Sequence, residues 1–168
     1  MIRGTVLSAL LVALLVIVQS TWLDAVAVLG VVPDLSMIAL IYVSFRNESL
    51  QGQVAGFVAG LLQDGVSSSP FGLNAFVKTC LAWAFNALSG KFYIDGVFVP
   101  MAFGLAGTLA KAVLTLVLSW IFPAVVATYD FLGPALWVEA AYNAALSPLL
   151  FLALRPFDGL LAPGDRER

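Results

Sequence analysis

The sequence predicts an all-α integral membrane protein that folds as a six-helix transmembrane bundle. The 168-residue chain is 61% hydrophobic and only 11% charged, whereas a typical soluble domain carries about 25% charged residues. A soluble fold of this length cannot bury so many apolar side chains, so a bilayer must solvate them. Polar and proline-containing segments divide the apolar sequence into six stretches, and each stretch predicts one helix.

The composition also excludes several kinds of site. The net charge of −2 predicts no basic surface for nucleic acid. The chain has no histidine, and its one cysteine, Cys80, precludes an internal disulfide and a Cys/His metal cluster. The sequence contains no phosphate-binding glycine loop and no nucleophile paired with a base. We therefore expect no cofactor, no bound metal and no enzymatic activity.

The first helix is predicted over Met1–Trp22. It carries one basic residue, Arg3, and an unbroken apolar run over Val6–Val18. Trp22 stands where an aromatic residue of the membrane surface is expected. Because Ala25-Val26-Ala27 resembles a signal-peptide cleavage site, the segment fits either a leader or a first span. The length of the apolar run favours a retained helix.

The second helix is expected to open at Pro33 and Asp34. Proline suits a first helical turn, and a carboxylate is favourable at the positive end of the helix dipole. The apolar run Leu35–Phe45 follows, and Arg46 ends it. This helix is shorter than the roughly 20 residues of a straight span. It must therefore be tilted, begin earlier, or be shielded by protein at one end.

Four further helices follow, and their boundaries are set by serine, glycine and proline. Their predicted ranges are Leu50–Gln63, Phe71–Leu88, Val97–Phe122 and Pro134–Leu154. Pro148 lies inside the last helix and is expected to kink it. Residues 1–155 should form a single transmembrane helical domain, and residues 156–168 a short, frayed cytoplasmic tail.

The distribution of basic residues predicts the orientation. With six spans and a cytoplasmic N-terminus, the basic residues on the cytoplasmic side are Arg3, Arg46, Lys91, Arg155, Arg166 and Arg168. The outer loops contain Asp24, Asp64 and Asp130 but no lysine or arginine. This is the positive-inside pattern. We expect a multi-pass protein with both termini in the cytoplasm.

The third helix carries a glycine at every fourth position. Gly52, Gly56 and Gly60 lie on one helical face, and Asp64 continues the series. In lipid, a ridge without side chains allows a second backbone to approach closely. The ridge is expected either to pack inside its own bundle or to receive a helix of another protein. In the second case, Asp64 and the loop Val66–Gly72 would extend the contact.

Three charged residues, Lys78, Lys111 and Glu139, interrupt otherwise apolar helices. Each costs about 2.5–3.5 kcal/mol near the centre of a membrane helix if it is unpaired. At about 1.5 Å per residue, all three lie on the order of 8–16 Å below the outer surface. The expectation is that some of these charges, together with Asp64, pair inside the bundle.

Two amides, Asn74 and Asn143, lie one helical turn from Lys78 and Glu139 and would complete this polar network. In one alternative, each lysine extends separately to the membrane surface. In another, the charges form a proton or ion pathway, although pumps usually align several carboxylates or histidines.

Several of these residues form a pattern that resembles a known family. The first part comprises Pro33-Asp34-Leu35, the apolar helix ending near Arg46, Gly56-Phe57-x-x-Gly60-Leu61-x-x-Asp64, and Gly72 at the next helix. The second part is Asn143-x-x-x-x-Pro148 followed by Arg155. Together they resemble the rod shape-determining protein MreD family, most clearly over Pro33–Ala82.

The resemblance implies a non-catalytic subunit of the bacterial cell-elongation machinery in the cytoplasmic membrane. Such a scaffold would act in cell morphogenesis and peptidoglycan synthesis. Its expected direct partner is MreC, and its indirect partners are MreB, RodA and a class B penicillin-binding transpeptidase. Contacts with membrane lipid and a possible homodimer are compatible with this function.

The family also resembles, in fold, the substrate-binding components of energy-coupling-factor vitamin transporters, and this gives the alternative function. A small-molecule pocket would open outward, between the loop Asp64–Leu73 and the outer ends of the last three helices. Such a pocket needs several converging polar groups. The sequence supplies few of them: Asn74, Lys78, Glu139 and Asn143.

Overall fold

The computed structural model describes residues 2–23, 27–28, 30–46, 50–91, 96–126, 130–131 and 133–161, and these are mainly helical. The long helices are α1 (Ile2–Trp22), α2 (Leu35–Arg46), α3 (Gln51–Val66), α4 (Leu73–Asn86), α5 (Phe98–Ile121) and α6 (Pro134–Leu154). Two short elements follow, η2 (Arg155–Phe157) and α7 (Asp158–Leu161). The six predicted helices are confirmed, and their ends lie within three residues of the expected positions.

Three stretches of the described chain are long and apolar enough to cross a membrane. They are Arg3–Trp22, Phe98–Ile121 and Pro134–Leu161. The three intervening helices are shorter, with 12 residues in α2, 16 in α3 and 14 in α4. A straight span needs about 20 residues. The helices identify a membrane protein, whereas six complete crossings stay a prediction.

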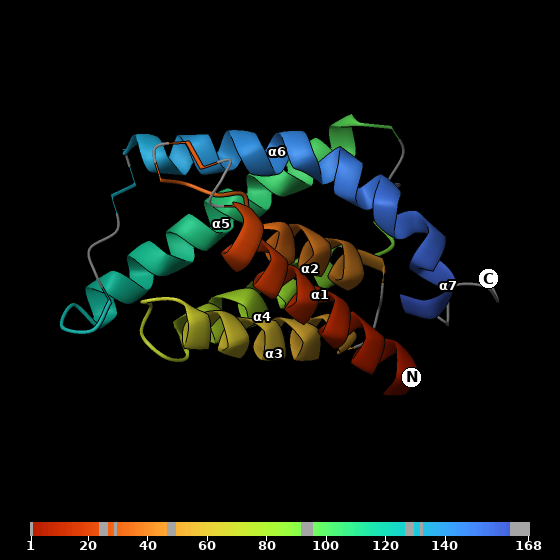
Figure 1. Ribbon diagram of the computed structural model, residues 1–168, viewed down its shortest axis with the longest axis horizontal. Coiled ribbons are helices and arrows are strands. Elements are labelled where there is room, and N and C mark those ends of the chain that lie inside the picture. The colour runs from red at the N-terminus through yellow and green to blue at the C-terminus, as the bar shows by residue number, and fades with distance from the viewer. Residues whose placement is uncertain are drawn as a thin grey trace.

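Helix α2 forms the centre of the molecule. It contacts α1, α3 and α4 on one side and α5 and α6 on the other, and Figure 1 shows these two groups of helices around it. Every residue from Ser36 to Phe45 is buried. Of the three explanations for the short second helix, the structure supports shielding by protein, since lipid does not reach these side chains.

Aromatic side chains join the helices near the end of α2 that carries Arg46. The ring of Phe103 lies 5.0 Å from that of Phe45 and 5.5 Å from that of Phe85, measured between ring centroids. Tyr42 meets Phe151 edge to face at 5.0 Å. Pairs with these geometries add about 0.5–1.5 kcal/mol beyond the burial of their area. They hold α2, α4, α5 and α6 together.

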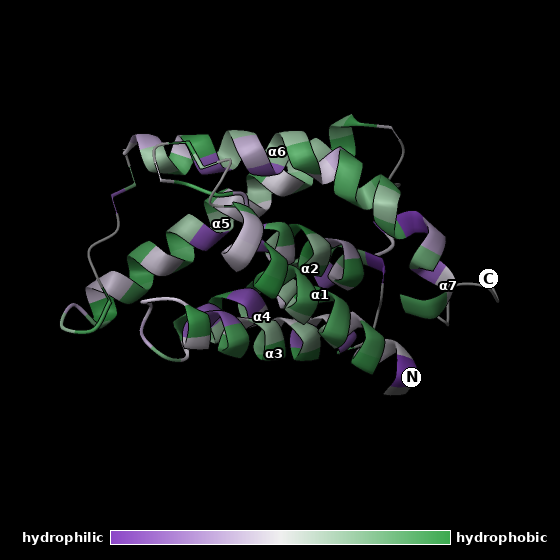
Figure 2. Ribbon diagram, viewed as in Figure 1, coloured by the Kyte–Doolittle hydropathy of each residue, from purple (hydrophilic) through white to green (hydrophobic). Residues whose placement is uncertain are grey.

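Hydrophobic residues, drawn green in Figure 2, occur along all the long helices, with fewer hydrophilic residues between them. Large hydrophobic side chains such as Leu10, Phe57 and Leu149 are at least half exposed. Many exposed large hydrophobic side chains are typical of a protein solvated by lipid. The first turn of α1 and the short helix α7 lie at the same end of the molecule (Figure 1).

The expectation of a frayed tail is wrong for residues 155–161. These residues form η2 and α7, and α7 packs against α1. Leu161 is only 4% exposed. The sequence signal was misleading because the segment is partly polar, yet one carboxylate and one leucine are enough to dock it. Some residues named in the sequence predictions lie outside the described residues. They are Asp24, Ala25 and Val26 (the first two residues of the cleavage-site pattern), Arg166 and Arg168.

Candidate functional site

The glycine ridge of α3 faces the interior of the bundle. A β-carbon added at Gly60 would lie 2.3 Å from the Cα of Ala75, and one added at Gly56 would lie 2.9 Å from the carbonyl oxygen of Lys78. A β-carbon at Gly52 would meet Ser44. The ridge therefore packs on α4 and α2, as one of the two interpretations held. The other interpretation, a docking ridge for another protein's helix, is not supported, because the chain's own backbone occupies that face.

Asp64 is buried and caps the start of α4. Its carboxylate accepts backbone N–H bonds from Gly72 (2.9 Å), Asn74 (2.9 Å) and Ala75 (3.2 Å), and a side-chain bond from the Asn74 amide (2.8 Å). Gly72 has φ of +96°, a conformation that glycine adopts without a steric penalty. Asp64 and Gly72 thus fix the loop between α3 and α4, and Asn74 is paired with Asp64 instead of with Lys78.

A second buried carboxylate, Asp34, lies at the start of α2 and is 4% exposed. Its Oδ1 accepts hydrogen bonds from the hydroxyl of Ser36 (2.8 Å) and the backbone N–H of Met37 (3.0 Å). These bonds satisfy donors that a helix N-terminus leaves free. Because this carboxylate is buried in the protein, it needs positive partners there.

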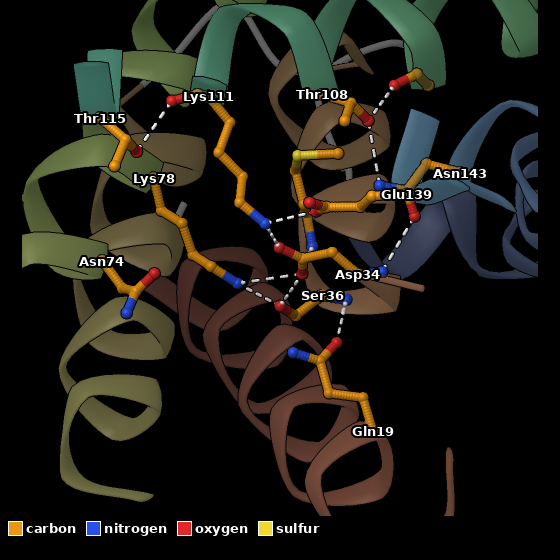
Figure 3. A network of polar contacts seen from close by, with 12 residues as sticks. Gln19, Asp34, Ser36, Asn74, Lys78, Thr108, Lys111, Thr115, Glu139 and Asn143 are labelled. Atoms are coloured by element: carbon orange, nitrogen blue, oxygen red, sulfur yellow. Dashed lines mark hydrogen bonds and ion pairs between the residues drawn. The ribbon is translucent and has the colours of Figure 1, made fainter. Parts of the chain in front are cut away.

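Two lysines supply those partners. Lys111 Nζ lies 3.0 Å from Asp34 Oδ2 and 2.5 Å from Glu139 Oε1. Lys78 Nζ lies 3.5 Å from Asp34 Oδ1 and also donates to the hydroxyl of Ser36. Figure 3 shows both ammonium groups converging on Asp34. The two lysines and two carboxylates balance in charge, and this balance offsets much of the cost of removing each ion from water.

Neutral side chains extend this ion network, which we define as Asp34, Lys78, Lys111 and Glu139. Asn143 accepts the backbone N–H of Asp34 (2.9 Å) and donates to the hydroxyl of Thr108 (3.0 Å). Gln19 accepts the backbone N–H of Ser36 (3.0 Å). The ion network and its neutral neighbours therefore connect α1, α2, α4, α5 and α6 in one cluster (Figure 3).

The structure brings together four residues that the sequence singled out: Lys78, Lys111, Glu139 and Asn143. Sequence reasoning missed Asp34 as their centre, because it assigned that carboxylate to the dipole of its own helix. A usable signal was present. An acidic residue that opens a helix too short to span the bilayer must lie inside the membrane unless the helix is displaced.

The two prolines lie at the ends of the cluster. Pro33 is buried directly before Asp34, and Pro148 lies inside α6, which continues to Leu154. Directly before Pro148, the hydroxyl of Ser147 donates to the carbonyl oxygen of Asn143 (2.5 Å). A β-carbon added at Gly104 would lie 2.5 Å from the same carbonyl oxygen. Close packing of α5 on α6 thus sets the position of Asn143.

The polar groups expected to line a transporter pocket are engaged with one another. Asn74 is bound to Asp64, Glu139 to Lys111, and Lys78 to Asp34. A hollow of about 260 Å³ among the described residues has an apolar lining, formed by Val28, Val138, Ala141 and Tyr142. The described residues contain no group of three acidic, histidine or cysteine side chains arranged to hold a metal. The arrangement is suited to fixing helices, and the transporter function is not favoured.

Comparison with known proteins assigns the family. The family model described as rod shape-determining protein MreD matches residues 2–157, which is almost the whole chain. Neither the curated proteins nor the solved structures contain a significant match. The matched region includes the six long helices, α1 to α6, and all four charges of the ion network. The chain therefore belongs to the rod shape-determining protein MreD family.

Proposed function

We propose that this protein is a non-catalytic scaffold of the cell-elongation machinery in the bacterial cytoplasmic membrane. In this proposal it binds MreC directly, and MreB, RodA and a class B penicillin-binding transpeptidase through MreC. The observation that carries the proposal is the family match over residues 2–157, since that family determines rod shape. The proposed topology has six passages with both termini in the cytoplasm, and the protein acts as a monomer or a homodimer.

The internal chemistry supports a scaffold. The four charges of the ion network are paired with one another. A catalyst would need reactive groups accessible to a substrate. Paired charges that are buried or partly buried instead hold helices in fixed positions, and a rigid bundle presents a constant surface to a partner. The fold likeness to transporter substrate-binding components stays a prediction.

The proposed surface for MreC includes the loop between α3 and α4. Val66 and Phe71 are 60% and 78% exposed, while the bonds from Gly72, Asn74 and Ala75 to Asp64 fix the loop at its base. A preorganised loop loses little conformational entropy on binding. Trp22, Trp120 and Trp137 are also exposed, and we attribute them to the membrane-interface belt.

The test is depletion of the protein in its rod-shaped host, followed by complementation. Cells should become round on depletion and regain rod shape with the wild-type chain. A tagged chain purified from mild detergent should retain MreC, and the double variant Val66→Ser/Phe71→Ser should retain at least several-fold less. Val97→Ser/Phe98→Ser, which changes an exposed pair at the opposite end of the bundle, is the matched control. Unchanged shape with a new nutrient requirement would support transport and refute the scaffold.

A further inference from the structure

The C-terminal strap, which we define as residues 155–161, closes one end of the bundle. It consists of η2 and α7, and α7 packs against α1. Leu161 is 4% exposed, whereas Phe157 and Leu160 are 49% and 57% exposed. The strap is therefore anchored by one buried leucine, and its other large apolar side chains face outward. Such a small apolar anchor cannot determine the docked position alone.

A carboxylate provides the second attachment. Asp158 Oδ1 accepts a hydrogen bond from the hydroxyl of Tyr42, and Asp158 Oδ2 lies 3.2 Å from a terminal guanidinium nitrogen of Arg46. The guanidinium carbon of Arg46 lies 5.6 Å from the centroid of the Tyr42 ring. Arg46 and Tyr42, both on α2, thus form a carboxylate-binding pair that combines a charge, a fork of donors and a hydroxyl.

The residues of this contact differ in burial. Tyr42 is fully buried in the central helix, so its hydroxyl needs a partner and its position is fixed. The side chains of Arg46 and Asp158 are 27% and 34% exposed. An ion pair with this exposure is screened by solvent and contributes little free energy. The receptor is therefore rigid, while the carboxylate that it holds belongs to a short segment near the end of the chain.

We propose that the strap is a reversible, autoinhibitory closure, in which Asp158 occupies a site for an acidic segment of another protein. In the closed state, Asp158 of the same chain fills this site. When the strap opens, Arg46 and Tyr42 bind a carboxylate of the partner in its place. The site lies at the end of α2 opposite the ion network. The inference is independent of MreC binding at the α3–α4 loop, so either proposal can fail alone.

Cysteine labelling measures the closure directly. In a Cys80→Ser background, Leu161→Cys reports the buried anchor and Leu160→Cys is its exposed neighbour. In purified protein, a maleimide should label position 161 at least roughly tenfold more slowly than position 160, because labelling requires local opening. Asp158→Ala should bring the two rates within about twofold of each other. Asp158→Asn and Tyr42→Phe, which each remove one interaction, should give intermediate rates. Equal rates with Asp158 intact, or no acceleration by Asp158→Ala, would overturn the closure.

Peptide binding measures the site. The probes are a fluorescent tetra-aspartate peptide and a tetra-asparagine peptide of the same length. Asp158→Ala should bind tetra-aspartate roughly tenfold more tightly than the wild type does, because the internal carboxylate no longer competes. The double variant Asp158→Ala/Arg46→Gln should bind tetra-aspartate no more tightly than the wild type does. Tetra-asparagine should bind the wild type and Asp158→Ala equally. Equal binding of tetra-aspartate by the wild type and Asp158→Ala, or a gain that persists with Arg46→Gln, would refute the acidic-segment site.

Discussion

Lys111 Nζ lies 3.0 Å from Asp34 Oδ2, although 77 residues separate the two in the chain. This contact joins the middle of α5 to the beginning of α2, and Glu139 adds α6 through the same ammonium group. Since these charges are buried or only partly exposed, each depends on the others for its counter-charge. The stability of the bundle should therefore follow the charge balance of the cluster more closely than the number of its hydrogen bonds.

Replacement of Asp34 tests the centre of the ion network. Asp34→Ala leaves Lys78 without a carboxylate partner and Lys111 with Glu139 alone, so the free energy of unfolding should fall by about 3–5 kcal/mol. Asp34→Asn should cost less, because an amide oxygen still accepts from Ser36 and Met37. Thermal unfolding in detergent measures the stability of Asp34→Ala and Asp34→Asn. The control is Asp130→Asn, because Asp130 is exposed. Equal melting temperatures for Asp34→Ala and the control would contradict the assignment.

A double-mutant cycle tests charge balance. Lys111→Met alone leaves two carboxylates and one lysine, whereas Lys111→Met/Glu139→Gln leaves the neutral pair of Lys78 and Asp34. The double variant should therefore be more stable than the single variant Lys111→Met, with a coupling energy of about 0.5–3 kcal/mol. Chemical denaturation of the wild type, Lys111→Met, Glu139→Gln and the double variant gives this coupling energy. Additive losses would show that Lys111 and Glu139 act independently.

Two glycines of α3 provide a matched test of helix packing. Gly60→Ala places a methyl group 2.3 Å from the backbone of Ala75, and the resulting overpacking should cost about 1–3 kcal/mol. Gly65→Ala meets no atom within 4 Å, so it should be neutral or stabilise by up to about 1 kcal/mol. Melting temperatures in detergent distinguish the two outcomes.

Larger substitutions along the same helix should show the same direction. Gly56→Leu and Gly60→Leu should prevent assembly of α3 on α4 and abolish rod-shape complementation. Val58→Leu should be mild, because Val58 is 37% exposed on the opposite face. Immunoblots of membranes measure how much of each variant accumulates. Equal tolerance of all three changes would remove close backbone packing as the reason for the glycines.

Asp64 should matter more than Asp130 in the same complementation assay. Asp64→Ala leaves the buried N–H of Ala75 and its neighbours without an acceptor, and each unsatisfied donor costs about 1–3 kcal/mol. The amides of Gly72, Asn74 and Ala75 should then exchange hydrogen faster, and rod shape should be restored less fully. Asp64→Asn keeps an acceptor oxygen and should be intermediate. If Asp130→Ala reduced rod-shape complementation more than Asp64→Ala does, Asp130 would be the more important carboxylate and the prediction would be wrong.

The sequence predicts the helices well because each apolar run ends at a proline, a glycine or a charge. It also identifies Lys78, Lys111 and Glu139, since a charge inside an apolar helix needs a partner whatever the topology. The identity of that partner depends on where α2 lies in three dimensions. Asp34 opens a helix that looks like a short span, and its place at the meeting point of five helices is a tertiary property.

The partners of Asp64 were also not predictable from the sequence, although they are closer to it in the chain. Its bonds reach residues 8 to 11 positions ahead through a loop, and helical periodicity does not describe such a return. The regular spacing of Gly52, Gly56 and Gly60 places Asp64 on the same helical face, which was expected either to pack inside the bundle or to receive a helix of another protein. The spacing correctly indicates close packing, but it does not specify whether the second backbone belongs to the same chain. Docking of Asp158 on Tyr42 and Arg46 lies beyond sequence patterns for the same reason.

The position of Asp34 also has a consequence for the order in which the protein is made. Its two counter-ions follow 44 and 77 residues later, and a ribosome that adds about 5–20 residues per second needs roughly 4–15 s to reach Lys111. During that interval the nascent chain carries an acidic group whose final neighbours do not yet exist. The complete set of ion pairs around Asp34 can therefore form only after Lys111, in the middle of α5, has been synthesised.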